Sequence, residues 1–194
     1  YGFHATFKAP FRLAAGLEES DLCRRVKEIA ASQSPIMLPG LTLADLNGFV
    51  ALVPRRVPPE LPRLAAAFVT QADSFRAPLT TADLARRHAA GLTDRQRALL
   101  DAWGYPYVLE EWRFHMTLSD TLGIGLREAV MEELRPLAQC VASQPVRIDA
   151  VALFRQSDRE TPFLVHRVFP LAGCGSIGQE QGPPDRQVAA PRSR

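Results

Sequence analysis

The chain has 194 residues, of which 46% are hydrophobic and 23% are charged, and its formal net charge is +2. This composition suits a globular protein of one substantial domain or two small lobes. The charge is too small to demand a nucleic acid or membrane partner, but it is compatible with a small anionic substrate. The three cysteines form no CxxC pair, which argues against a disulfide framework or zinc knuckle and favours the reducing cytoplasm.

The first part of the chain predicts a strand, a helix and two further strands. Residues 1–8 alternate between apolar and polar side chains, as in a strand with one buried face. Residues 18–33 carry apolar side chains at helical spacing. Two apolar runs, residues 36–43 and 48–53, are joined by "DLNG", which predicts two strands with an Asn-Gly turn between them. Because the chain starts at Tyr1, inside a predicted strand, we expect the natural protein to begin upstream.

The middle of the chain predicts mainly helices. Residues 60–73 and 81–90 have helical patterns. Thr93 and Gln96 form the sequence of a capping box, and Gly104 is placed to end the helix that this box begins.

The last part repeats the order of the first. Residues 112–119 predict a strand, and residues 126–142 predict a helix in which Pro136 is expected to cause a kink or a break. Residues 146–154 and 162–169 are rich in β-forming side chains. The order of strand, helix, strand and strand therefore occurs twice, which indicates an internal duplication.

The duplication also predicts how the chain is divided. Residues 172–194 are rich in Gly, Pro, Gln and Arg and lack a core pattern, so we expect them to be disordered. The predicted parts are a first lobe at 1–57, a mainly helical segment at 58–111, a second lobe at 112–171 and the tail at 172–194.

Two of the four histidines lie in the same short motif, "FHATF" and "FHMTL". Side chains alternate along a strand, so His4 and Thr6 share one face of the first strand, and His115 and Thr117 share one face of the second. Each imidazole then lies about 7 Å along the backbone from a hydroxyl. One such strand alone is more often structural than catalytic. If two duplicated lobes pack about a pseudo-twofold axis, however, both pairs face one groove.

This arrangement suits hydrolysis of a cyclic phosphodiester. A base must deprotonate water on one side of the phosphorus, and an acid must protonate the leaving oxygen on the other. Imidazole can take either role near neutral pH, and hydroxyl groups can donate to the non-bridging phosphate oxygens. Two histidines without carboxylate or thiolate neighbours make a poor zinc site. We therefore expect a site with no metal and no cofactor.

Longer strings resemble a known family. In order, "YGFHATFKAPFRLA", "FRAPLT", "ARR", "WGYPYV" and "WRFHMTL" resemble the two-histidine phosphoesterase superfamily, and within it a bacterial branch associated with phosphonate-utilisation operons. The resemblance covers roughly residues 1–170 and places His4, Thr6, His115 and Thr117 on the motif positions. Members of this branch begin with a further strand and helix, so we expect about 40 further residues upstream of this chain in the natural protein.

The resemblance implies an α+β fold of two lobes, each an antiparallel sheet with outer helices, and an active-site cleft between them. It implies metal-independent activity on cyclic phosphates or 2′–5′ linkages, with the two histidines as acid and base in an order that stays open. The operon association suggests 5-phosphoribosyl 1,2-cyclic phosphate as the substrate.

Further residues are candidates for binding the substrate. Lys8 shares the predicted face of the first motif and could contact phosphate; the alternative is an edge-strand lysine in solvent. Arg76 and Arg87 could bind a second phosphate, although ion pairs are the commoner role for each. Tyr105 could flank a sugar or base, or belong to an interlobe core. His166 has no threonine partner, so we predict that it is structural.

The main prediction is thus a cyclic phosphodiesterase that acts on a small phosphorylated sugar or nucleotide. One alternative is the same chemistry on RNA, as in a 2′,3′-cyclic phosphodiesterase or a 2′–5′ RNA ligase-like enzyme, which predicts a basic groove with stacking aromatic residues. An alternative of another class is a non-catalytic protein that binds a phosphoribosyl ligand.

Overall fold

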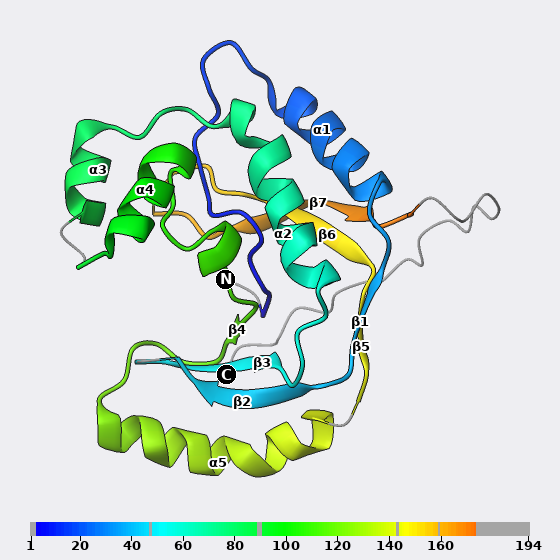
Figure 1. Ribbon diagram of the computed structural model, residues 1–194, viewed down its shortest axis with the longest axis vertical. Helices are drawn as coiled ribbons and strands as arrows, with labels where there is room; N and C mark the ends of the chain where they lie inside the picture. The colour runs from blue at the N-terminus through cyan, green and yellow to red at the C-terminus, as the bar shows by residue number, and fades with distance from the viewer. Residues whose placement is uncertain (1–2, 47, 89–90, 143, 159, 174–194) are drawn as a thin grey trace, which may run out of the picture.

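The computed structural model describes residues 3–46, 48–88, 91–142, 144–158 and 160–173 (Figure 1). The α-helices in these ranges are α1 (Glu19–Ala31), α2 (Glu60–Gln71), α3 (Thr81–His88), α4 (Asp94–Trp103) and α5 (Ile124–Ala142). The strands are β1 (Ile36–Leu38), β2 (Leu41–Asp45), β3 (Val50–Pro54), β4 (Met116–Thr117), β5 (Val146–Ile148), β6 (Ala150–Arg155) and β7 (Leu164–Pro170). The described chain is therefore an α+β protein with small antiparallel sheets. Its helices include none with both the length and the apolar character to span a bilayer.

The helices follow the sequence pattern closely. The capping box before α4 is confirmed, because the Thr93 side chain accepts a hydrogen bond from the backbone of Gln96 and the Gln96 side chain caps the backbone of Thr93. Gly104 ends α4 with φ of +74°. Pro136 does not break α5, which continues to Ala142. The missing N–H of Pro136 costs one helical hydrogen bond, while packing of α5 on β2 and β3 holds the helix together.

The strands differ more from their predictions. Residues 3–8 belong to no strand ladder within the described part of the chain. The predicted strand 36–43 is split at Gly40, where φ is +140° and a Cβ atom would lie 2.0 Å from the carbonyl oxygen of Ala142. Residues 112–119 contribute only the short strand β4. The Asn-Gly turn is only partly testable, because Asn47 lies outside the described residues, as does most of the predicted tail.

Strand pairing crosses between the two predicted halves. The hairpin β2–β3 from the first half pairs with β4 from the second, with Ala51 opposite Thr117, and α5 packs on this sheet. The hairpin β6–β7 from the second half packs against α1 from the first. A ladder of β1 and β5, with Ile36 opposite Ile148, links the two groups of elements (Figure 1).

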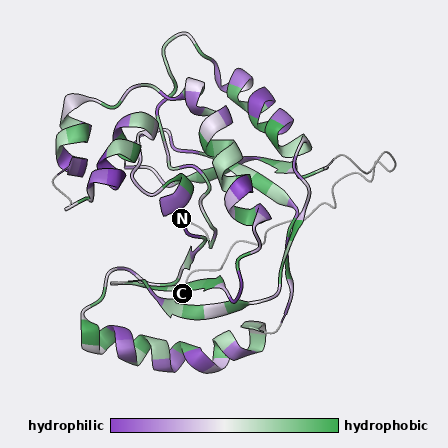
Figure 2. Cartoon of the chain, viewed as in Figure 1, coloured by the Kyte–Doolittle hydropathy of each residue, from purple (hydrophilic) through white to green (hydrophobic). Residues whose placement is uncertain are grey.

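The main hydrophobic core joins elements from both ends of the chain. Its fully buried members include Ile29, Leu38, Leu61 and Leu64. Figure 2 shows the strands largely in hydrophobic colours, whereas α1 and α5 carry both classes of residue, as expected for helices with one buried face. Ala5 and Phe7 of the first motif pack against this core. The apolar face that the alternation predicted is thus anchored, except for Phe3, which is 58% exposed.

Candidate active site

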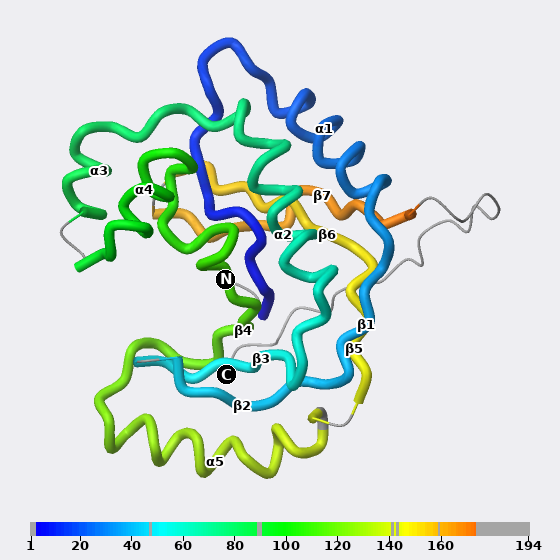
Figure 3. The backbone as a smooth tube through the Cα atoms, viewed as in Figure 1, coloured from blue at the N-terminus to red at the C-terminus, as the bar shows by residue number. Residues whose placement is uncertain are grey.

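The two motifs meet at one pocket. His4, Thr6, His115 and Thr117 line a pocket of about 420 Å³, and the other lining residues are Leu118, Ser119 and Asp120. In Figure 3 the N-terminal segment and the segment that enters β4 run side by side in the middle of the molecule. We call this the motif pocket.

Packing positions the first motif. Phe7 stacks on Phe68, with ring centroids 6.0 Å apart, and its ring lies 5.8 Å from that of Trp112. The indole Nε1 of Trp112 also donates a hydrogen bond of 2.9 Å to the carbonyl oxygen of Thr6. On the opposite side, the imidazole of His4 lies 5.3 Å from the ring of Phe154 in β6. The motif is therefore held by side chains, although it has no strand partner.

The second motif is held by β4 and by a backbone contact of its histidine. His115 Nδ1 lies 2.9 Å from the carbonyl oxygen of Arg113. A carbonyl only accepts hydrogen bonds, so Nδ1 carries the proton, and in the neutral imidazole Nε2 carries the lone pair. The ring of Phe49 lies 5.8 Å from this imidazole. His115 is thus oriented with Nε2 left to exchange a proton.

The hydroxyl groups at the pocket differ in what they already bind. Ser119 Oγ accepts a hydrogen bond of 3.0 Å from the Val50 N–H and donates one of 2.9 Å to the Asp120 carbonyl. The hydroxyls of Thr6 and Thr117 make no hydrogen bond to the described part of the chain. Two hydroxyls are therefore left for a ligand, while the third joins β3 to the segment after β4.

Lys8 and Arg76 do not line the motif pocket; both bind one carboxylate elsewhere. Lys8 Nζ lies 2.9 Å from Asp73 Oδ1 and donates to the Val69 carbonyl at 3.0 Å. Arg76 contacts Asp73 through both Nε and Nη2, each at 2.9 Å, and also donates to the carbonyl of Ala102. The predicted phosphate contact of Lys8 assumed that strand alternation reaches residue 8. Because the chain bends at residues 7–8, this lysine turns inward instead.

Arg87 and Tyr105 also lie away from the motif pocket. Arg87 donates to the Gly104 carbonyl at 3.0 Å, and its guanidinium lies 5.6 Å from the centroid of the Tyr105 ring. Tyr105 meets Tyr107 edge-on and packs against a second, smaller hydrophobic cluster that includes Leu99. The structure therefore gives both residues contacts that join α3 to α4 and the loop after it.

Asp73 gives a prediction about stability and pH. Burial opposes its ionisation, but hydrogen bonds from Arg76 and Lys8 outweigh burial and hold the pKa of Asp73 below its ordinary value of 3.8. Burial lowers the pKa of Lys8 from 10.5, and Asp73 opposes that shift. A carboxyl with a lowered folded pKa stabilises the fold above its unfolded pKa, and this stability is lost as pH falls through the folded value.

We therefore expect Asp73→Asn to lower the free energy of unfolding by about 2 kcal/mol near neutral pH. The difference from the parent should begin to shrink below pH 3.8, the ordinary pKa of the carboxyl, and should be lost as pH falls through the lower folded pKa of Asp73. Urea unfolding of both proteins across this pH range measures the difference in their free energies of unfolding. Asp94→Asn is the control, since the Asp94 side chain is 99% exposed and should change stability little. A difference that stays constant with pH would contradict the assignment.

A cluster of metal ligands within the described ranges, residues 3–46, 48–88, 91–142, 144–158 and 160–173, would argue against the predicted metal-free site. No group of three or more His, Cys, Asp or Glu side chains there is placed to hold a metal ion. The site without metal or cofactor stays a prediction, tested below by chelation.

Comparison with known proteins places the chain in a family. Residues 6–164 match the sequence model of a family described as "Protein of unknown function (DUF1045)". The chain belongs to this family. The matched range includes Thr6, His115 and Thr117, and His4 lies just before it.

Two curated relatives carry the name "Ribose 1,5-bisphosphate phosphokinase PhnN". One, from Janthinobacterium sp. (strain Marseille), is 41% identical over 182 residues, which is 90% of this chain and 40% of the relative. The other, from Laribacter hongkongensis (strain HLHK9), is 38% identical over 186 residues, which is 94% of this chain and 42% of the relative. The chain thus spans about two fifths of the length of these relatives.

Proposed function

We propose that this chain is a phosphoesterase that opens a cyclic phosphodiester, with His4 and His115 as general acid and base. The observation that carries the proposal is the motif pocket, where two imidazoles from distant parts of the chain meet two threonine hydroxyls that make no hydrogen bond to the described residues. The proposal includes the bilobal architecture of the two-histidine phosphoesterase superfamily. One lobe would contain the first motif with α1 and β6–β7, the other β2–β3–β4 with α5, and the motif pocket would lie between them.

The reaction needs a proton transfer on each side of the phosphorus. One imidazole takes a proton from water as the water oxygen bonds to phosphorus. The other gives a proton to the ring oxygen as its bond to phosphorus breaks. The orientation of His115, with Nδ1 donating to Arg113, leaves Nε2 for either step. Thr6 and Thr117 donate to the non-bridging oxygens, where negative charge accumulates. The two imidazoles end with exchanged protonation states and reset through solvent.

The names of the relatives support a phosphorylated ribose as substrate. Hydrolysis of 5-phosphoribosyl 1,2-cyclic phosphate at the bond between phosphorus and the ribose O2 atom gives ribose 1,5-bisphosphate, the compound in both names. The relatives have more than half of their length outside the matched segment, which leaves room for a kinase domain. We therefore propose that this segment makes the compound that the rest of such a chain phosphorylates. This agrees with a role in phosphonate breakdown, which the sequence resemblance suggests.

Phosphorus NMR of the reaction tests this proposal. The chain is incubated with 5-phosphoribosyl 1,2-cyclic phosphate in EDTA, and we expect conversion to ribose 1,5-bisphosphate. Phosphate retained on O2 would overturn the regiochemistry. Turnover of only 2′,3′-cyclic nucleotides would replace the substrate with the RNA alternative. A ligand-dependent rise in melting temperature without turnover would favour the binding protein, and loss of activity on chelation would overturn the metal-independent mechanism.

A further inference from the structure

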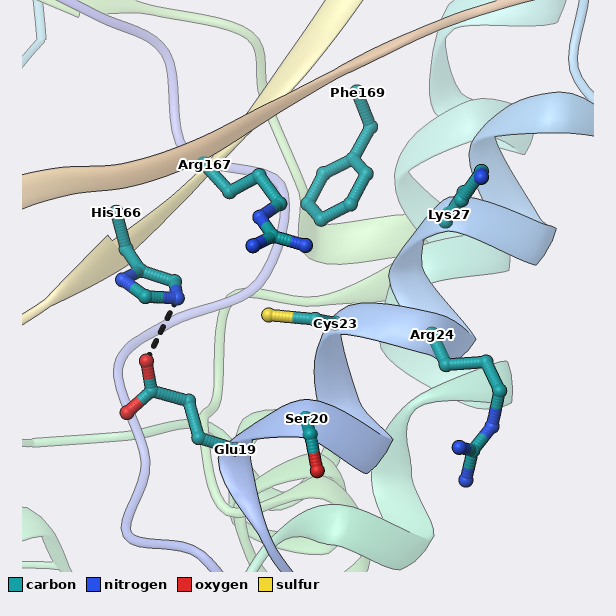
Figure 4. Close-up of a pocket in the computed structure, with 8 residues that line it drawn as sticks. All are labelled: Glu19, Ser20, Cys23, Arg24, Lys27, His166, Arg167 and Phe169. Carbon is teal, nitrogen blue, oxygen red and sulfur yellow. Dashed lines mark ion pairs between the residues drawn. The ribbon is translucent and has the colours of Figure 1, made fainter.

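A second pocket lies between α1 and β7, away from the motif pocket. It has a volume of about 500 Å³ and is lined by Glu19, Ser20, Cys23, Arg24, Lys27, His166, Arg167 and Phe169. None of these residues lines the motif pocket. Figure 4 shows His166, Arg167 and Phe169 extending from β7 toward Cys23 on α1. We call this the α1–β7 pocket.

A β-bulge brings two basic side chains of β7 into this pocket. In a regular strand, neighbouring residues point to opposite faces, so His166 and Arg167 would not line the same space. Here Leu153 pairs with Arg167 and Phe154 pairs with Val165, which leaves His166 as an extra residue. A bulge of this kind re-aims a side chain. His166 therefore joins Arg167 on the side that faces α1.

Most of the acidic charge in this region is already paired. Glu19 is the acidic residue that lines the α1–β7 pocket, and its carboxylate lies 2.7 Å from His166 Nε2 and 3.5 Å from Arg155. Arg24 at the rim pairs with Asp21 on its own helix. The carboxylates of Glu19 and Asp21 are therefore already in ion pairs, and neither of them pairs with the remaining cations of the pocket.

Lys27 and Arg167 are those cations. Neither has an ion pair or hydrogen bond with the described part of the chain, and both side chains belong to exposed residues. These two cations give the pocket a positive potential and hydrogen-bond donors, which favour an anionic ligand.

We propose that the α1–β7 pocket binds a small phosphorylated anion, with Arg167 as the main contact and Lys27 at its rim. A guanidinium can donate two parallel hydrogen bonds to two oxygens of one phosphate group. Water and chloride each offer it only one acceptor atom. The pocket volume is in the range of small-molecule sites. The inference stands apart from the phosphoesterase proposal, because the two pockets share no residue.

A proton–nitrogen NMR titration of the chain tests this site. Inorganic phosphate and ribose 5-phosphate are added at constant ionic strength, and the amide signals of Ser20, Cys23 and Arg167 are followed. These signals should move together with one Kd. The double variant Lys27→Ala, Arg167→Ala should bind more weakly, with a Kd about ten-fold higher or more. Signals from the motif pocket report separately on any binding there.

Arg63→Ala is the matched control. Arg63 is exposed on α2 and has no ion pair within the described chain, so its loss should leave the Kd unchanged. Circular dichroism checks that each variant is folded, and Arg167→Lys, which keeps the charge, should retain part of the affinity. Tighter binding of ribose 5-phosphate than of phosphate would identify a sugar phosphate as the ligand, and equal binding would identify phosphate itself. The proposal is overturned if the α1 and β7 signals do not move, or if the double variant binds as the parent does.

Discussion

Replacing either His4 or His115 with alanine is expected to reduce turnover of the cyclic phosphate by about 10²–10⁴-fold. This is the range that general acid or base catalysis contributes. Each variant removes one of the two proton transfers, because the imidazoles would act on opposite sides of the phosphorus. Release of product, followed by phosphorus NMR in EDTA, gives kcat for each variant. The double variant should be little slower than the slower single variant, since groups that act as a unit are not additive.

His88→Ala is the matched control for this experiment. His88 lies in α3, where its Nε2 atom is 3.2 Å from Asp101, and it does not line the motif pocket. Its loss should leave kcat close to that of the parent. Near-parental turnover in both motif variants would contradict the proposed function. A large loss of kcat in His88→Ala would mean that removing any histidine disturbs the fold, and the motif variants would then not report on catalysis.

Local patterns predicted the helices and part of the apolar face of the first motif. The α4 cap depends on residues three apart, Thr93 and Gln96, and such short-range chemistry can be read directly from sequence. The apolar alternation likewise predicted that Ala5 and Phe7 face the core. Both features are decided by neighbours along the chain, so they do not require knowledge of the tertiary fold.

Long-range pairing could not be predicted in the same way. The sequence indicates two similar halves, but it does not say that β3 of the first half pairs with β4 of the second. Hydrogen bonding between backbones does not depend on which half supplies a strand, so a hairpin can complete either sheet. The inward turn of Lys8 has a similar origin, because its partner Asp73 is distant in sequence.

Each motif histidine has an aromatic neighbour from the other half of the chain. His4 packs near Phe154, and His115 packs near Phe49. Each imidazole thus meets a phenyl ring from a hairpin region of the opposite half of the chain. No short motif in the sequence predicts either phenylalanine as a neighbour of a histidine. Each contact joins residues that are far apart in the sequence. The two histidines therefore have similar contacts, and each contact needs residues from both halves of the chain.

Removing the hydroxyl of Thr6 or Thr117 is the second change expected to have a large effect. Valine keeps nearly the same shape but cannot donate a hydrogen bond to a non-bridging phosphate oxygen. Loss of one such donor typically costs about 10²–10³ in kcat. We therefore expect Thr6→Val and Thr117→Val each to lower kcat by this factor, with a smaller change in KM, when initial rates are measured on the cyclic phosphate.

Ser119→Ala separates this role from a general need for hydroxyl groups at the motif pocket. Ser119 Oγ already accepts from Val50 and donates to Asp120, so it has no hydrogen left for a phosphate. Its loss should lower the free energy of unfolding by about 1 kcal/mol while changing kcat far less than either threonine variant does. Equal losses of kcat in all three variants would mean that the hydroxyls maintain the shape of the pocket, and the threonines would then have no special part in stabilising the transferred charge.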